Sequence, residues 1–126
     1  MANFSVTFSA YINQPPTVVG NYSTTKANRE GGTAGIILTS AMFTTSTVPA
    51  YSDPEGDAAD AVRIDTLPTN GAVLKLDSAN VTVGQVISIA DITANKLKLV
   101  APDANALTTS VFTFSVRDTG SMTFVG

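Results

Sequence analysis

Hydrophobic and polar residues alternate along most of this chain with a period of two, which is the pattern of β-strands and not of helices. In the stretch FSVTFSAYI, every second residue is apolar, so one face carries Phe4, Val6, Phe8, Ala10 and Ile12. The stretches KLKLV (96–100) and VFTFSVRD (111–118) alternate in the same way. These three segments are the strongest strand predictions.

Weaker alternation predicts further strands over residues 17–26, 33–39, 61–67, 72–77, 84–89 and 121–125. In the segment 111–118 the alternation predicts that the apolar side chains point inward. The side chains predicted to point outward are Thr113, Ser115 and Arg117. Two stretches suit single helical turns, residues 39–43 and 89–95, the second capped by Ser88 or Asp91. Short strands with little helix predict an all-β fold, an antiparallel β-sandwich.

Turn residues separate these segments. Pro15 and Pro16 end the first strand, because proline donates no hydrogen bond to a sheet ladder. The pair Asn70-Gly71 in LPTNGAV lies between two β-rich stretches and predicts a tight hairpin, since both residues tolerate positive φ.

The composition supports one folded domain without a nucleic-acid or membrane partner. The chain has 126 residues, of which 44% are hydrophobic and 13% charged, so it can bury a core. Its net charge is −3, and its seven basic residues are scattered. A DNA or RNA surface needs clustered basic residues, and a membrane surface needs a basic amphipathic stretch.

Cysteine, histidine and tryptophan are absent from the sequence. This excludes a thiol nucleophile, a Ser–His–Asp triad and a zinc site built from histidine or thiolate ligands. Paired carboxylates could still act on a glycoside, but an aromatic-lined sugar cleft is not suggested by any motif, so we expect no enzyme. The N-terminus has neither a basic region nor a continuous apolar core, so we expect synthesis in the cytoplasm without a signal peptide.

An ordered set of motifs resembles the cadherin-like, or chondroitin-sulfate-proteoglycan-like, repeats of large bacterial adhesins. The motifs are NQPP, REGG, YSDPEGD, LPTNG, GQVISIADI and FTFSVRD, and together they span about residues 13–118. The resemblance implies an immunoglobulin-like (cadherin-like) β-sandwich over residues 13–126, with an added N-terminal strand or arm over residues 1–12.

Such repeats usually stand in tandem, whereas here a single one carries an extra strand. By analogy of architecture, a free-standing domain of this kind looks like a virion protein of a tailed bacteriophage, made in the host cytoplasm. The expected function is a capsid decoration (cement) protein that binds the major capsid protein and other virion proteins, as a homo-oligomer. The alternatives are a phage tail or fibre component and a carbohydrate-binding adhesin module of a cell surface.

The acidic loop YSDPEGD is the candidate metal site. Asp53, Glu55 and Asp57 alternate around Gly56, and oxygen-rich clusters of this kind suit Ca²⁺. In the resembled repeats the aspartate after the final strand lies near this loop, which adds Asp118 to the candidate ligands. The alternative, favoured by the turn chemistry, is a solvated loop in which Asp53 forms an Asx-turn. No other cofactor is expected.

The N-terminal stretch is the candidate interface. In the interpretation that we favour, residues 2–12 are an edge strand of the domain's own sheet. The other makes them an arm that pairs with a neighbouring subunit, because a free strand edge recruits other strands. The candidate contact residues are Phe4, Val6, Phe8 and Tyr11.

Overall fold

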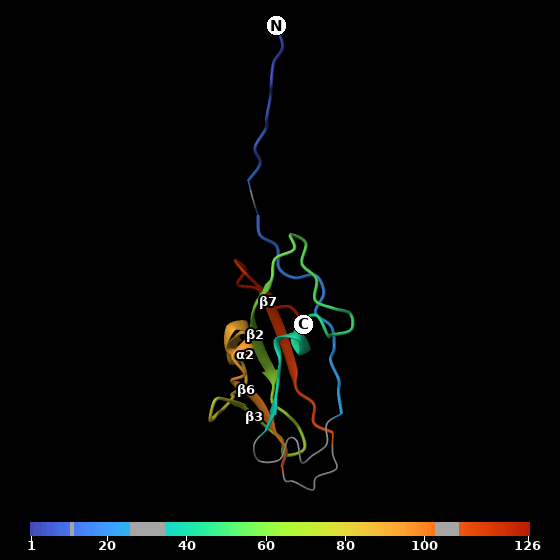
Figure 1. The fold of residues 1–126 in the computed structure, drawn as a ribbon, viewed down its shortest axis with the longest axis vertical. Helices are drawn as coiled ribbons and strands as arrows, with labels where there is room; N and C mark the ends of the chain where they lie inside the picture. Colours follow the sequence, from blue (N-terminus) through green and yellow to red (C-terminus); the bar gives the residue numbers. More distant parts are fainter. Residues whose placement is uncertain (11, 26–34, 103–108) are drawn as a thin grey trace.

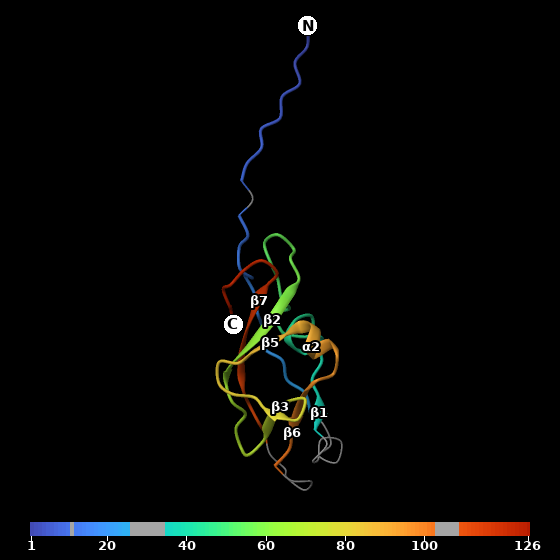
Figure 2. The same cartoon turned by 90° about the vertical axis from the view of Figure 1, so that its left-hand side faces the viewer.

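The chain is all-β in the computed structural model, which describes residues 1–10, 12–25, 35–102 and 109–126. Its strands form two antiparallel sheets (Figures 1 and 2). The first sheet has the order β1-β6-β3-β4, with the bounds Ile36–Ile37, Leu97–Val100, Val73–Leu76 and Ala79–Asn80. The second has the order β5-β2-β7, with the bounds Val86–Ser88, Ala59–Thr66 and Thr113–Asp118.

The two sheets share one hydrophobic core. Val62 and Ile64 of β2 and Val116 of β7 are fully buried, and they cluster with Leu74 of β3 and Leu97 of β6. Inward residues recur at every second position, because successive side chains of a strand point to opposite faces. The all-β prediction with paired antiparallel sheets is therefore confirmed.

Two short helical turns connect the sheets. The 3-10 turn η1 (Ser40–Phe43) and the helix α2 (Ile89–Thr93) both lie where the sequence predicted single turns. Ser88 is the N-cap of α2, and its hydroxyl accepts a hydrogen bond of 3.0 Å from the backbone N–H of Asp91. The ring of Phe43 in η1 is buried and packs edge-to-face on Phe114 at 4.9 Å.

The remaining strand predictions are confirmed to different extents. Strands form within or over the segments 61–67, 72–77, 84–89, 96–100 and 111–118, whereas the segment 33–39 contributes only β1. The first segment of the domain pairs at single bridges, Val18 with Ser52 and Asn21 with Val48. The segment 121–125 likewise forms one bridge, between Val125 and Val116.

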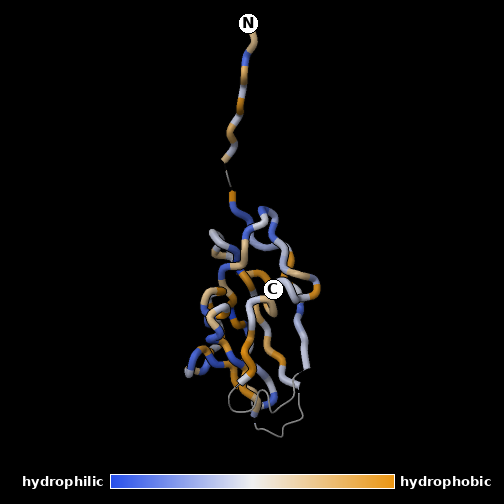
Figure 3. The backbone as a smooth tube through the Cα atoms, in the orientation of Figure 1, coloured by the Kyte–Doolittle hydropathy of each residue, from blue (hydrophilic) through white to orange (hydrophobic). Residues whose placement is uncertain are grey.

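The strand predicted over residues 4–12 does not form, and the preference for an edge strand of the same sheet is wrong. Residues 1–10 and 12 are extended but pair with no strand, and all of them are exposed. They form an arm that leaves the sheets at one end, and Figure 3 shows apolar and polar residues alternating along it. The alternation was read correctly, but both sheets close their core without this segment, so its apolar face has no cover in its own chain.

The hairpin predicted at Asn70-Gly71 is also wrong in its pairing. The turn itself forms, with φ of 58° and 80°, and the N–H of Ala72 donates to the carbonyl of Thr69 at 3.4 Å. The strands on either side of it, however, belong to different sheets. The turn residues set the local backbone, but burial of β2 and β3 on opposite sides of the core decides their partners.

Ser115 lies on the outer face of β7, as predicted, yet it is buried. Its hydroxyl donates to Asp65, and Gly126 at the end of the C-terminal segment lies against it. The ring of Phe124 lies between two guanidinium groups, 5.0 Å from that of Arg63 and 5.3 Å from that of Arg117. In the part of the chain that the structure describes, no helix has the length and apolar character needed to cross a membrane.

Candidate cation site at the root of the N-terminal arm

The acidic loop is a turn built around one carboxylate. Asp53 Oδ1 accepts hydrogen bonds from the backbone N–H of Glu55 at 2.9 Å and of Asp57 at 3.0 Å. Gly56 adopts a φ of +77°, which other residues rarely adopt, and its N–H donates to the carbonyl of Asp53. The predicted Asx-turn at Asp53 is therefore present, and it fixes the backbone of the loop around the Asp53 carboxylate.

The loop and the end of β7 bring three carboxylates together. One oxygen from each of Asp53, Asp57 and Asp118 lies within 4.8 Å of the others. Ca²⁺ binds oxygens at about 2.3–2.6 Å, so ligands on opposite sides of one ion are about 5 Å apart. The spacing fits a hard cation. Glu55, the fourth predicted ligand, is not part of this cluster, because its carboxylate accepts from the backbone N–H of Gln14.

The electrostatics of the cluster are asymmetric. Burial raises the pKa of Asp118, which is fully buried at the end of β7, and the neighbouring Asp53 raises it further. Burial also acts to raise the pKa of Asp53, but the backbone N–H groups of Asp57 and Glu55 outweigh it, so this pKa is lowered. Among the described residues, Asp53 Oδ2 is buried without a donor unless a protonated Asp118 supplies one. A cation between the two carboxylates would satisfy both.

Asn13 completes the site, and the sequence interpretation assigned it no role. Its side-chain amide donates to both carboxylate oxygens of Asp118, at 3.2 and 3.1 Å. A Cβ placed on Gly120 would lie 3.7 Å from the same amide, so the turn after β7 closes over it. The only hint in the sequence was its position in the motif NQPP, directly before Gln14 and the two prolines. The root of the arm and the acidic cluster are thus one structure.

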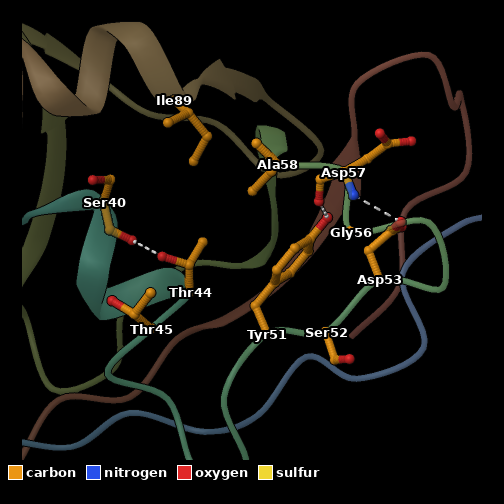
Figure 4. A pocket seen from close by; sticks show the side chains of 11 residues that line it. Ser40, Thr44, Thr45, Tyr51, Ser52, Asp53, Gly56, Asp57, Ala58 and Ile89 are labelled. Carbon is orange, nitrogen blue, oxygen red and sulfur yellow. Dashed lines mark hydrogen bonds between the residues drawn. The ribbon is translucent and has the colours of Figure 1, made fainter.

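A pocket of about 520 Å³ opens beside the acidic loop (Figure 4). The Tyr51 hydroxyl donates to the backbone carbonyl of Asp57 at 3.1 Å, and burial, with a smaller effect of the nearby Asp53 charge, raises the pKa of Tyr51 to about 12. The described lining includes no lysine or arginine; it consists of Ser40, Thr44, Thr45, Tyr51, Ser52, Asp53, Gly56, Asp57, Ala58, Ala59 and Ile89. Its hydroxyl and carboxylate rim can hydrogen-bond a neutral polar ligand.

The predicted interface residues lie apart from this pocket, on the arm. Phe4 and Phe8 are 93% and 90% exposed, and Val6 is 55% exposed. Tyr11, the fourth predicted contact, lies outside the described residues. The arm therefore presents its apolar side chains to solvent, on a segment fastened at its root by Asn13.

Comparison of the chain with protein-family models, with curated proteins and with solved structures found no match in any of the three. The resemblance to adhesin repeats therefore stays a prediction from sequence motifs.

Proposed function

We propose that this chain is a non-enzymatic structural protein of a tailed-bacteriophage virion, a capsid decoration protein with an immunoglobulin-like (cadherin-like) body. One observation carries the proposal: the arm exposes Phe4 and Phe8 almost completely and pairs with no strand of its own chain. A lone exposed apolar side chain is ordinary, but a row of them at strand spacing marks a contact surface. The arm thus supports a role in assembly.

In this role the protein acts by binding alone. The arm joins subunits into a homo-oligomer, and the body docks on the major capsid protein or on another virion protein. A shell repeats the same docking site many times, so linked copies reach a high total affinity from weak single contacts. The small net charge of −3 gives no long-range attraction to nucleic acid.

The proposal includes a Ca²⁺ ion held by Asp53, Asp57 and Asp118. The oxygen spacing and the buried Asp53 Oδ2 support it. Because Asn13 binds the same Asp118, an ion at this site would stiffen the root of the arm. The ion would fix the direction in which the arm leaves the domain.

The test is quantitative mass spectrometry of purified phage particles from the source of the sequence. We expect this chain of 13.0 kDa in a copy number comparable to that of the shell protein. A low copy number, equal to that of a single ring of subunits, would instead assign the chain to the tail or a fibre. Absence from the particles would overturn the proposal.

The pocket beside Tyr51 favours a second candidate function, a carbohydrate-binding adhesin module. Its lining combines one aromatic ring with hydroxyl and carboxylate groups and has no basic side chain in the described residues, which suits a neutral saccharide. Titration with a panel of neutral methyl glycosides, followed by ¹H–¹⁵N NMR, tests this function. Shifts confined to the N–H groups around Tyr51 and Thr45 would support it, and unchanged spectra would exclude it.

A further inference from the structure

The arm has the pattern of a strand but lacks a sheet. Its apolar residues Phe4, Val6 and Phe8 share one face, and Ser5, Thr7 and Ser9 would share the other. Residues 1–10 are extended, which is the backbone conformation that a strand requires. An isolated pair of two such arms would leave the apolar face uncovered, and two-stranded ribbons are marginally stable in water. The arm is better completed by the edge of a larger sheet.

The edge strands of the two sheets differ in what they offer. Of the four edge strands in the described residues, β1 and β4 have two residues each and β5 has three, whereas β7 has six. On the side of β7 that faces away from β2, Val116 forms a bridge with Val125, and Gly126 lies against the backbone of Phe114 and Ser115. The C-terminal segment therefore covers part of this edge and must leave it before another strand can pair there. β7 still offers the longest acceptor edge.

The aromatic side chains of β7 and of the residue before it also suit an apolar strand beside them. Phe112 and Phe114 pack on the core but are only partly buried, next to the ring of Phe43. A strand added to this edge with its apolar face inward would place phenylalanines beside these rings. Each fully buried aromatic side chain removes about 150–250 Å² from water, and aromatic pairs are favourable beyond that area.

The direction of the arm fits the same edge in a second copy. Asn13 lies against Asp118, the last residue of β7, and the arm continues past that end of the domain (Figures 1 and 2). The chain thus runs toward its own domain along the arm, whereas β7 runs toward the arm. A second copy in the same orientation, placed beyond this end, presents its β7 antiparallel to the arm, as all pairs in these sheets are.

We infer that the arm of one copy adds as an antiparallel strand to the outer edge of β7 in the next copy. Six residues of strand span about 20 Å, so residues 4–9 match the length of β7 and the rest of the arm joins the two domains. The incoming strand displaces Val125 and Gly126 from this edge, and the two hydrogen bonds between Val125 and Val116 (2.8 and 2.9 Å) are remade with the arm. The Phe124 contacts lie on the face of the sheet and not on its edge.

Between copies in the same orientation such a contact is heterologous, because each copy donates its arm to one neighbour and accepts the arm of another. Heterologous contacts build open chains or closed rings, and not isolated two-fold dimers. The inference deepens the proposed assembly role by naming the partner of the arm, and it rests on that role.

Disulfide trapping in the full chain tests the inference, since the natural sequence has no cysteine. One cysteine replaces Thr113, which is exposed on the outer face of β7, and the second replaces Ser5, Thr7 or Ser9, to scan the register. In the matched control the acceptor cysteine replaces Asn80, which is also exposed but lies on β4. Opposed residues of antiparallel strands bring their Cβ atoms within disulfide reach.

We expect at least one pair with Thr113→Cys to give a ladder of linked oligomers on a non-reducing gel. The ladder requires both cysteines and disappears when Phe4→Ser and Phe8→Ser are added. Three results would overturn the inference: dimers from the arm cysteine alone, equal linking to Asn80→Cys, or no ladder at any register. A chain that is present on particles but forms no ladder refutes only this inference, whereas a ladder in a chain absent from particles refutes only the virion role.

Discussion

The side-chain amide of Asn13 donates to both carboxylate oxygens of Asp118, across 105 residues of chain. One pair of residues therefore ties the start of the domain to the end of its last long strand. Asp118 is fully buried, so Asn13 supplies hydrogen bonds that water does not replace.

Replacing Asn13 by alanine should destabilise the domain. The change leaves a buried carboxylate without its main side-chain donor, which costs about 1–3 kcal/mol in the free energy of unfolding. Urea unfolding followed by circular dichroism measures this loss. Gln14→Ala is the control, because Gln14 contributes its backbone N–H to Glu55 and not its side chain. Equal stability of the two variants would contradict the role of Asn13.

Calcium should stabilise the folded chain, and the effect should depend on Asp57 and not on Glu55. Thermal melts with 5 mM Ca²⁺ or with EDTA measure the shift; a ligand at 100 times its Kd adds about 2.7 kcal/mol. We expect Asp57→Asn to abolish the shift and Glu55→Gln to retain it, because only Asp57 of the two belongs to the carboxylate cluster. Identical melts of the wild-type chain with and without calcium would refute the site.

Acid should weaken the contact between Asp65 and Ser115. Burial alone would raise the pKa of Asp65, but the hydrogen bonds from Ser115 and Arg63 outweigh it, so the pKa is lowered below 3.8. A lowered pKa gives stability that is present above the unfolded pKa and is lost as pH falls through the folded pKa. Asp65→Asn should thus cost about 1 kcal/mol at pH 7, and the difference from wild type should shrink below about pH 4.

Urea unfolding at several pH values follows this difference. Asp77→Asn is the matched control for the lost charge. Asp77 is exposed and has a φ of +54°, which asparagine also adopts readily. A pH-independent difference for Asp65→Asn would exclude the electrostatic explanation.

Truncating a core phenylalanine should destabilise the domain, whereas truncating an arm phenylalanine should leave its stability almost unchanged. Phe43→Ala opens a cavity under the rings of Phe112 and Phe114 and should cost about 3–5 kcal/mol of stability. Phe8→Ala changes an exposed side chain, so the free energy of unfolding should move by less than about 0.5 kcal/mol. Phe8→Ala should instead weaken the association of copies, so light scattering at high protein concentration should give a lower mass than for the wild-type chain. A loss of stability as large as that of Phe43→Ala would show that the arm packs on its own domain.

The period-two pattern was sufficient to predict the class of fold and the positions of most strands. It predicted β6 and β7 well, because their alternating residues face one shared core. It failed over residues 4–12, because an alternating pattern shows that a segment can be a strand but does not name its partner. The hairpin prediction at Asn70-Gly71 failed for the same reason: the turn forms, but the strands before and after it, β2 and β3, do not pair with each other.

The candidate site was predicted in part, for a similar reason. Asp53 and Asp57 lie in one short loop, so their proximity follows from local turn chemistry. The approach of Asp118 depended on the resemblance to adhesin repeats, since no local pattern links residues so far apart. Glu55 alternates with the two aspartates in sequence, but the turn around Gly56 directs it to the arm. The role of Asn13 depended on the tertiary fold alone.

The pairing of β2 with β7 also bears on the order of events during synthesis. β2 ends at Thr66, and its neighbour β7 begins at Thr113, so the second sheet is incomplete until the last part of the chain has left the ribosome. The arm leaves the ribosome before any strand of the two sheets, because it precedes them in the sequence. A nascent chain therefore exposes the apolar side chains of Phe4 and Phe8 while its second sheet is still incomplete.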